Sequence, residues 1–340
     1  MQNFENLTRG GQIRRMRRLA ETALAAYDLG DVHLMPLMHF FNTTFRVDAC
    51  PRSGRTGQER GERYVIRIHR PGSQDASTIE SELIWLLALR HDMGLVVPEP
   101  VPTRDGSLVT LASTPGVPEP RHCVLFRWVD GRFLRSRLGV KELERVGAFM
   151  AKLHCHAEHF IVPEGFFRKQ WDYEGLRSGV LGTDLEQSWA HLSQGDRAIL
   201  DAVGERVQHA MQTLGEGSEV FGLIHADFYE GNYLFSKEEV HAIDFDGSGW
   251  GCYLFDIGVA FSTLLARDNY PALRQAFLKG YRQVRPFSGD HEALIDTFIA
   301  GRLMCHVLWL AAHLDEPSYE VRAARRIQYE LGELKAFLAR

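Results

Sequence analysis

The chain has 340 residues, of which 45% are hydrophobic and 24% charged, and its formal net charge is −5. This is the composition of an ordinary globular protein long enough for two lobes, and the negative charge excludes a generally basic nucleic-acid binder. The five cysteines are scattered without a C-x-x-C pair, which favours reduced thiols in a cytoplasmic protein. The sequence shows neither an apolar run of about 20 residues nor a signal-peptide pattern, so we expect no membrane association.

The first third of the chain predicts helices and antiparallel strands. Residues 9–28 predict a helix with a basic first half, which could touch a membrane or RNA but more simply packs on the N-terminal part of the fold. A second helix is predicted over 77–90, and the prolines that follow end it. The Gly- and Arg-rich stretch 48–62 predicts an exposed, mobile connection. The segments whose patterns predict strands are 32–47 (two strands), 63–70, 108–111 and 123–128.

The turn pair Asp130-Gly131 marks a change in pattern, because helices prevail after it. We therefore place a boundary there, with one domain at 1–129 and a second at 130–340. The segments of the second domain that predict helices are 141–156, 184–214, 270–285 and 288–314.

Acidic and amide side chains gather between residues 221 and 246. The apolar run 221–224 predicts a buried strand that ends at His225, Ala226 and Asp227. The segments 232–235 and 240–243 flank a polar stretch and predict a hairpin. If its turn is centred on Glu238, Asn232 and Asp244 face each other, with Cβ atoms about 4.5–5.5 Å apart.

An amide oxygen and a carboxylate that face each other suit Mg²⁺, which proteins usually hold with one or two carboxylates and substrate phosphates. Asn232 and Asp244 are therefore predicted metal ligands, and Asp227 is left to orient or deprotonate an attacking hydroxyl. Asp246 fits either a second metal contact or a turn residue before Gly247. Asp256 predicts the N-cap of a helix over 257–265.

The order of these residues resembles the aminoglycoside phosphotransferase and choline kinase superfamily, small-molecule relatives of the protein kinases. The resemblance rests on H-A-D-F-Y-E-G-N at 225–232, I-D-F at 243–245 and F-D-I-G at 255–258. It implies an α+β, bilobal protein-kinase-like fold with a small antiparallel β-sheet lobe carrying a helix and a larger, mainly helical C-terminal lobe. It also implies ATP and Mg²⁺ as cofactors, and His225 as the residue that orients the catalytic loop.

The resemblance also implies a nucleotide site in the N-terminal lobe. Where a kinase has a glycine-rich loop, Asn42, Thr43 and Thr44 would supply donors to phosphate oxygens. Arg67 falls at the position of the phosphate-binding lysine of kinases, with Glu82 as its ion-pair partner. This is a departure, because a planar guanidinium and a compact ammonium are not interchangeable in geometry.

The resemblance further implies that adenine binds where the two lobes connect. The backbone of 123–129, which includes Phe126 and Trp128, is the expected place for its hydrogen bonds.

The sequence thus predicts a kinase that moves the γ-phosphate of Mg-ATP to a hydroxyl of a small molecule, such as an aminoglycoside, an amino alcohol or a homoserine-like acceptor. One alternative is a protein Ser/Thr kinase similar to bacterial stress-response kinases, although the chain lacks a D-F-G and A-P-E pair. Others are a nucleotide-binding regulator without turnover, and a metal-dependent hydrolase using His225, Asp227, His241 and Asp244. The sequence leaves the acceptor and the oligomeric state open.

Overall fold

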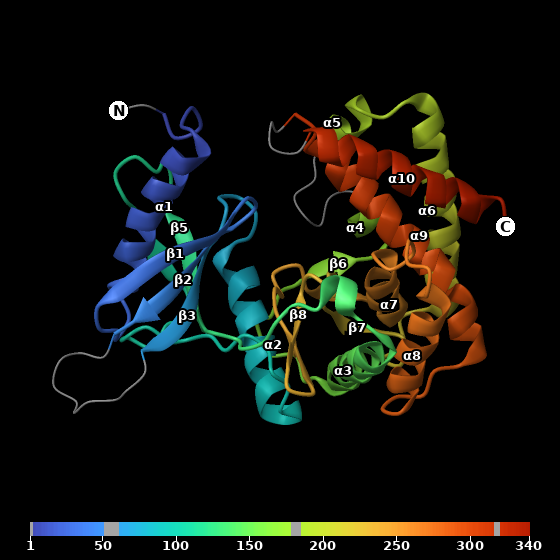
Figure 1. Ribbon diagram of the computed structural model, residues 1–340, viewed down its shortest axis with the longest axis horizontal. Helices are drawn as coiled ribbons and strands as arrows, with labels where there is room; N and C mark the ends of the chain where they lie inside the picture. The colour runs from blue at the N-terminus through green and yellow to red at the C-terminus, as the bar shows by residue number, and fades with distance from the viewer. Residues whose placement is uncertain (1–2, 51–60, 178–184, 316–319) are drawn as a thin grey trace. The chain divides into compact units, whose positions relative to one another are not determined.

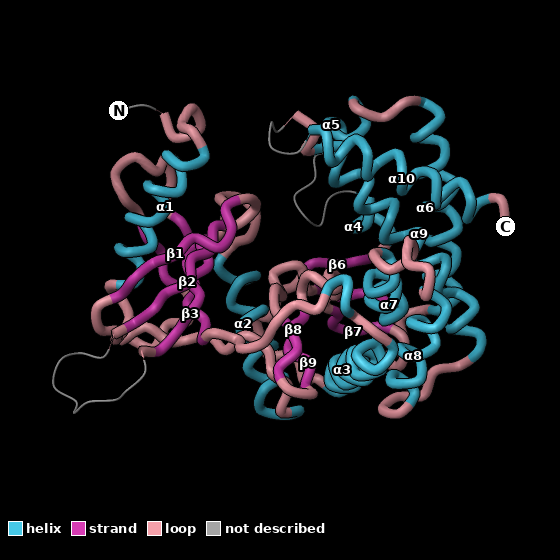
Figure 2. Tube along the Cα trace, in the orientation of Figure 1, coloured by secondary structure: helices cyan, strands magenta, loops and turns pink. Residues whose placement is uncertain are grey.

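The computed structural model describes residues 3–50, 61–177, 185–315 and 320–340. The chain divides into two compact units, which are described separately. Unit 1 comprises Met1–Asp130 and Glu164–Phe167, and unit 2 comprises Gly131–Pro163 and Arg168–Arg340. Strands prevail in unit 1 and helices in unit 2 (Figure 1, Figure 2). The expected combination of a β-rich N-terminal part and a mainly helical C-terminal part is confirmed, while most of the predicted 48–62 connection lies outside the described residues.

Unit 1 contains an antiparallel sheet with two helices, and its described strands follow the order β1-β2-β3-β5-β4. The strands are β1 (Val32–His39), β2 (Thr43–Ala49), β3 (Glu62–Ile68), β4 (Thr110–Ala112) and β5 (Arg121–Arg127). The helices are α1 (Arg9–Leu24) and α2 (Ala76–Met93).

The two faces of this sheet have different environments, because successive side chains on a strand point to opposite sides. Ile66 and Ile68 of β3 belong to an apolar core with the buried face of α1. Arg67, between them, points to the other face and forms an ion pair with Glu82 of α2. The alternation of side chains along β3 therefore places α1 and α2 on opposite faces of the sheet. Helix α1 packs on the N-terminal part of the fold, which was the simpler of the two expectations for this basic segment, because its apolar face lies in this core.

Unit 2 is mainly helical, with small sheets beside the helices. Its described helices are the 3₁₀ helix η1 (Arg135–Arg137), α3 (Val140–His159), α4 (Tyr173–Arg177), α5 (Leu185–Ala190), α6 (Gln194–Leu214), α7 (Tyr253–Ser262), α8 (Tyr270–Arg282), α9 (Gly289–Ala312) and α10 (Glu320–Leu338). One sheet has the order β6-β10-β7, and β8 pairs with β9. The strands are β6 (Lys169–Trp171), β7 (Phe221–Ile224), β8 (Tyr233–Ser236), β9 (Glu239–Ala242) and β10 (Gly249–Cys252).

Several helix boundaries differ from the sequence expectation. The segment 184–214 is two helices rather than one, because Ser193 and Asp196 form a capping box that starts α6. The helix expected over 257–265 begins four residues earlier, at Tyr253. Helix α10 was not predicted at all.

Helix α9 is long and apolar enough to cross a membrane by length and composition. However, 61% of its most apolar 18-residue window is buried inside the structure, against α7, α10, α6 and α5. A helix that is apolar on most sides is what the centre of a helical unit requires.

Helices α3 and α8 approach each other closely at two glycines. A Cβ atom on Gly147 of α3 would collide with the carbonyl oxygen of Phe277, and one on Gly280 of α8 with that of Glu144. Both obstacles are backbone atoms, which cannot move without displacing a helix. The absence of side chains at these two positions therefore sets the separation of α3 and α8.

This packing makes a prediction for stability. Gly280→Ala should lower the free energy of unfolding by about 1–3 kcal/mol, because the added methyl overpacks the helix contact. The measurement is the midpoint of urea unfolding followed by circular dichroism. The matched control is Gly332→Ala on the exposed side of α10, where a Cβ meets nothing within 4 Å. That variant should be about 0.5–1 kcal/mol more stable. Equal effects of the two substitutions would contradict the packing argument.

Candidate active site

The catalytic loop expected from the sequence begins where buried strand β7 ends. Ala226 has φ +64°, in the left-handed region that costs an L-residue other than glycine about 1–2 kcal/mol. The carboxylate of Asp256 holds this conformation in place. It accepts hydrogen bonds from the backbone N–H of His225 at 2.9 Å and of Ala226 at 2.6 Å. The direction of the next side chain, Asp227, is thus fixed by a residue of α7.

Asp256 is structural, as expected, but its predicted N-cap role is wrong. Helix α7 begins at Tyr253 with Cys252 as its N-cap residue, so Asp256 lies inside the first turn. Its fully buried carboxylate bonds the neighbouring loop. The helix can start earlier because its first residues continue directly from β10.

His154 of α3 completes the environment of Asp256. Its Nε2 lies 3.3 Å from the Asp256 carboxylate and its Nδ1 lies 2.8 Å from the Tyr281 hydroxyl. Burial lowers the pKa of His154, against the opposing effect of Asp256, which favours the neutral ring. A carboxylate can only accept, so the single ring proton is on Nε2 and Nδ1 accepts from Tyr281. His154 is therefore a hydrogen-bonded core residue.

His225 is fully buried between two aromatic rings and has both ring nitrogens engaged by backbone atoms. Its Nε2 donates to the carbonyl of Ile243 at 3.0 Å, and its Nδ1 accepts from the N–H of Asp227 at 3.3 Å. The ring thus connects the catalytic loop to the segment that precedes Asp244. These contacts describe a positioning residue, which is the role that the sequence suggested.

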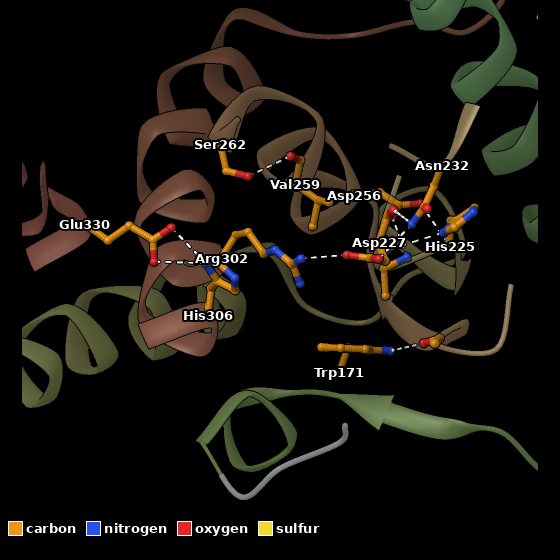
Figure 3. Close-up of polar contacts among 12 residues, drawn as sticks. Trp171, His225, Asp227, Asn232, Asp256, Val259, Ser262, Arg302, His306 and Glu330 are labelled. Carbon is orange, nitrogen blue, oxygen red and sulfur yellow. Dashed lines mark hydrogen bonds and ion pairs between the residues drawn. The ribbon is translucent and has the colours of Figure 1, made fainter. Parts of the chain in front are cut away.

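Asp227 is surrounded by an arginine and an amide. Its Oδ1 accepts from Nη2 of Arg302 on α9 at 2.6 Å, and its Oδ2 accepts from Nδ2 of Asn232 at 2.7 Å (Figure 3). Its side chain is still 30% exposed. Burial raises the pKa of Asp227 above its ordinary value, while Arg302 and His225 act in the opposite direction. A carboxyl with a raised pKa and both oxygens directed is suited to receive a hydroxyl proton.

The orientation of Asn232 follows from the same contacts. Its Nδ2 donates to the carboxylate and to the backbone carbonyl of Asp227, at 2.7 and 2.8 Å. Since both acceptors require an N–H, the amide oxygen must face the other way. Within the described part of the chain that oxygen has no hydrogen-bond partner, so it is available to a cation.

The hairpin register differs by one residue from the expectation. The described pairs include Tyr233 with Ala242, and the N–H of Ile243 donates to the carbonyl of Asn232 at 2.9 Å. Asn232 is therefore opposite Ile243 and not Asp244. The reason is that the turn has two residues, Lys237 and Glu238, and Lys237 adopts φ +56°. The centre of the turn therefore lies half a residue before Glu238.

Asp244 leaves the strand with φ +67° and is exposed, while the neighbouring Phe245 is buried. The charges of Asp227 and Asp244 both act on the Tyr229 phenol and, together with its burial, raise the pKa of Tyr229 to about 12. The charge of Asp246 acts on Asp227 in the same way. The three aspartates therefore share one electrostatic environment.

Sequence reasoning missed the residues that hold the segment after Asp244. Arg168, which is almost fully buried, donates through Nε to the Ser248 carbonyl at 2.7 Å and through Nη2 to the Asp246 carbonyl at 2.8 Å. Trp171 donates to the Gly247 carbonyl at 2.9 Å. These donors come from β6 and its approach, far away in the sequence, so the segment is fixed by backbone contacts.

Arg302 was missed as well, although the sequence held a signal for it. It is the one Lys or Arg in the apolar helix α9 (Gly289–Ala312). Charged residues are almost never deeply buried unless they have a partner, so an isolated arginine in such a helix indicates a partner elsewhere. The partner, Asp227, is 75 residues away in the chain.

In unit 1 the expected Arg67–Glu82 ion pair is present and buried, at 2.7 Å. The Arg67 guanidinium also lies 4.9 Å from the ring centroid of Phe126. Breaking such a buried pair by removing one partner typically costs about 3–5 kcal/mol, so each of these residues constrains the other.

The three polar residues of the β1–β2 turn are differently placed. Asn42 accepts the N–H of Arg70 at 3.3 Å, and the Thr43 hydroxyl bonds His39 at 2.8 Å. Thr44 is half-buried in β2. Trp128 follows β5 and is half-buried, with the guanidinium of Arg63 5.4 Å from its ring centroid.

The Asp256 contacts make a second prediction. Asp256→Ala should lower the free energy of unfolding by about 3 kcal/mol or more, because it leaves two buried N–H groups and a buried histidine proton without their acceptor. Thermal unfolding measures this loss. Asp201→Ala removes an exposed carboxylate paired with Arg177 and should change stability by less than about 1 kcal/mol. A loss for Asp256→Ala no larger than this control's would refute the structural role.

A family model described as the phosphotransferase enzyme family matches residues 42–293. A homoserine kinase of Neisseria meningitidis serogroup B is 27% identical over 266 residues, which cover 74% of this chain and 76% of that protein.

Two solved structures are similar over nearly their whole length. A microcompartment-associated aminopropanol kinase superposes with a TM-score of 0.78 at 28% identity, covering 94% of this chain and 95% of that one. An amicoumacin kinase in complex with AMP-PNP and Ca²⁺ has a TM-score of 0.78 at 19% identity, over 97% and 96%, which shows a shared fold. Because the family model spans most of the sequence, the chain belongs to the phosphotransferase enzyme family and is a kinase-type phosphotransferase with the protein-kinase-like α+β fold.

Proposed function

We propose that the protein transfers the γ-phosphate of Mg-ATP to a hydroxyl of a small molecule, with Asp227 as the group that receives the hydroxyl proton. The arrangement of Asp227 carries this proposal, since both of its oxygens are directed by Arg302 and Asn232. The acceptor oxygen forms a bond to the γ-phosphorus while the bond from that phosphorus to the β,γ-bridging oxygen breaks. The products are a phosphate monoester and ADP, and the proton passes to Asp227.

The metal would be held by Asn232 and Asp244, with Asp246 as a further candidate. The fit rests on chemistry, because the amide oxygen of Asn232 is left open by its contacts with Asp227 and the Asp244 carboxylate is exposed. Oxygen ligands of this kind and substrate phosphates are what Mg²⁺ prefers. When bound, the ion supplies positive charge to the phosphate oxygens.

Unit 1 would hold the nucleotide, so that residues 1–129 form the nucleotide-binding lobe and 130–340 the catalytic lobe. Arg67, oriented by Glu82, would contact phosphate oxygens, as would the turn of Asn42, Thr43 and Thr44. Since the side chains of Asn42 and Thr43 are engaged within unit 1, a phosphate bound there would have to share or replace these hydrogen bonds. Adenine would bind along the backbone at Phe126 and Trp128. The ATP analogue in the complex of a structural neighbour supports the use of a nucleotide.

The similar proteins favour a small-molecule acceptor over a protein. Homoserine kinase and aminopropanol kinase are named for small hydroxyl compounds, and both compounds are candidates for this chain. The hydrolase alternative loses support because both nitrogens of His225 are bonded to backbone atoms. We also propose a cytoplasmic location, in keeping with the five unpaired thiols of the chain.

Nucleotide binding is tested by thermal shift with the non-hydrolysable analogue AMP-PNP. At about 100 times its Kd the Mg²⁺ complex should stabilise the protein by about 2.7 kcal/mol, which raises Tm by about 4 °C for a chain of this size. EDTA should remove most of the shift, and so should Asp244→Ala. A shift that persists in EDTA and in Asp244→Ala would exclude the metal assignment.

Turnover is tested with Asp227→Asn. This variant should retain the Mg-AMP-PNP shift but lose about 10²–10⁴-fold in kcat, because the amide cannot receive the hydroxyl proton. ADP release with a panel of hydroxylated metabolites measures the rate. A near-normal kcat would reject Asp227 as the proton acceptor.

The pH profile tests the environment of Asp227. A base works only when deprotonated, so activity is lost as pH falls through its pKa, and burial raises that pKa. The acid limb of kcat/KM should therefore lie at a higher pH than an ordinary aspartate gives. Arg302 acts to lower the pKa of Asp227, so Arg302→Gln should move the limb higher still. Arg326→Gln, which removes a guanidinium with no contact to Asp227, is the control and should leave the limb in place.

A further inference from the structure

Arg302, which bonds Asp227, has N–H donors that make no hydrogen bond with the described residues. A guanidinium has five N–H donors, and one hydrogen bond, from Nη2 to Asp227, is the only one that Arg302 makes with the residues described in the structure. The side chain is 11% exposed, so its other donors are shielded from bulk water, and none of them bonds a side chain or carbonyl in the described ranges. A polar group on an acceptor whose hydroxyl lies at Asp227 would be within reach of these donors.

The carboxylates near Arg302, in contrast, already accept hydrogen bonds from other side chains. Glu330 of α10 is fully buried and accepts from Nε of Arg326 at 2.6 Å. It also accepts from Nδ1 of His306 at 2.7 Å (Figure 3). The two oxygens of Asp227 accept hydrogen bonds from Arg302 and Asn232. The described carboxylates whose charges act on Arg302 are these two, and each of their oxygens already accepts a hydrogen bond. Of these described groups, Arg302 is the one that still has donors for a second polar group of the acceptor.

An acceptor that carries a negative charge also needs this arrangement. A second carboxylate close to Asp227 would be repelled unless a cation lies between the two. Arg302 can serve both, because the separate edges of its planar guanidinium can bond one carboxylate each. A compact lysine ammonium could not fix two planar groups in this way.

We propose that Arg302 determines acceptor specificity by binding a carboxylate group of the acceptor while it keeps Asp227 in position. The acceptor class is a small hydroxy acid or hydroxy amino acid, with the hydroxyl and the carboxylate a few bonds apart, rather than an amino alcohol or an aminoglycoside. This inference rests on the proposed phosphoryl transfer. It chooses between the two kinds of compound for which the similar proteins are named.

The test uses two pairs of acceptors that differ by one carboxylate. L-homoserine is compared with 3-aminopropan-1-ol, and L-threonine with 1-aminopropan-2-ol. In the wild-type enzyme kcat/KM should be about 10- to 100-fold higher for the carboxylate member of at least one pair, as a charged hydrogen-bonded contact provides. Arg302→Gln should abolish this ratio, mainly through the KM of the carboxylate member. Because Arg302 also holds Asp227, kcat should fall for both members alike, and the ratio isolates the carboxylate contact.

The matched control is Arg326→Gln, which removes a guanidinium from the same charge cluster without touching Asp227. Its carboxylate preference should equal that of the wild type. Calorimetric titration of L-homoserine and L-threonine into the Mg-AMP-PNP complex gives a readout that needs no turnover. Wild-type binding that Arg302→Gln weakens about 10- to 100-fold supports the inference.

Three results would overturn the carboxylate assignment. They are a wild-type preference for the amino alcohols, a preference for the hydroxy acids that survives Arg302→Gln, and no calorimetric binding of either hydroxy acid. The proposed function fails on different measurements, namely the absence of a Mg-dependent AMP-PNP shift or of ADP release with any acceptor. A kinase active on amino alcohols alone would retain the function and lose the inference.

Discussion

The buried carboxylate of Asp256 is the constraint on which the active-site geometry depends. A charge without solvent is tolerated only where donors surround it, and here two backbone N–H groups and a neutral His154 do so. The same contacts hold Ala226 in a backbone conformation that its own sequence disfavours. The orientation of Asp227 is therefore decided by α7 and α3, through hydrogen bonds to the preceding two residues.

Three aspartates of unit 2 show how surroundings assign different roles to one residue type. Asp256 is inaccessible to solvent and serves the backbone. Asp227 is partly accessible and shares its charge with an arginine and an amide. Asp244 is exposed and lies in a left-handed conformation beside a buried phenylalanine. These surroundings give Asp256 its structural role, and they are the basis for proposing proton transfer at Asp227 and a cation at Asp244.

The features that sequence reasoning found are those encoded locally. His225, Asp227 and Asn232 lie within eight residues, so their pattern is visible without a fold. The ion pair of Arg67 with Glu82 could also be predicted, because kinases have a cation on this strand that pairs with a glutamate on the next helix. The hairpin register could not be predicted from spacing alone, since the choice between a two- and a three-residue turn moves every partner by one.

The features that were missed are non-local. Arg168 and Arg302 reach their partners from about 75 to 80 residues away, and no short motif connects them. Helix α10 was missed although its buried Glu330 meets α9 through His306. Such contacts depend on which helix faces which, and a single sequence does not contain that information in its periodicity.

The contact between α3 and α8 has a consequence for catalysis. Gly147 lies two helical turns before His154 on α3, and Gly280 directly precedes Tyr281 on α8. The helix separation that the glycines permit is thus the separation at which Tyr281 reaches His154, and His154 reaches Asp256. Two residues without side chains, remote in sequence from Asp227, thereby take part in fixing the direction of its carboxylate.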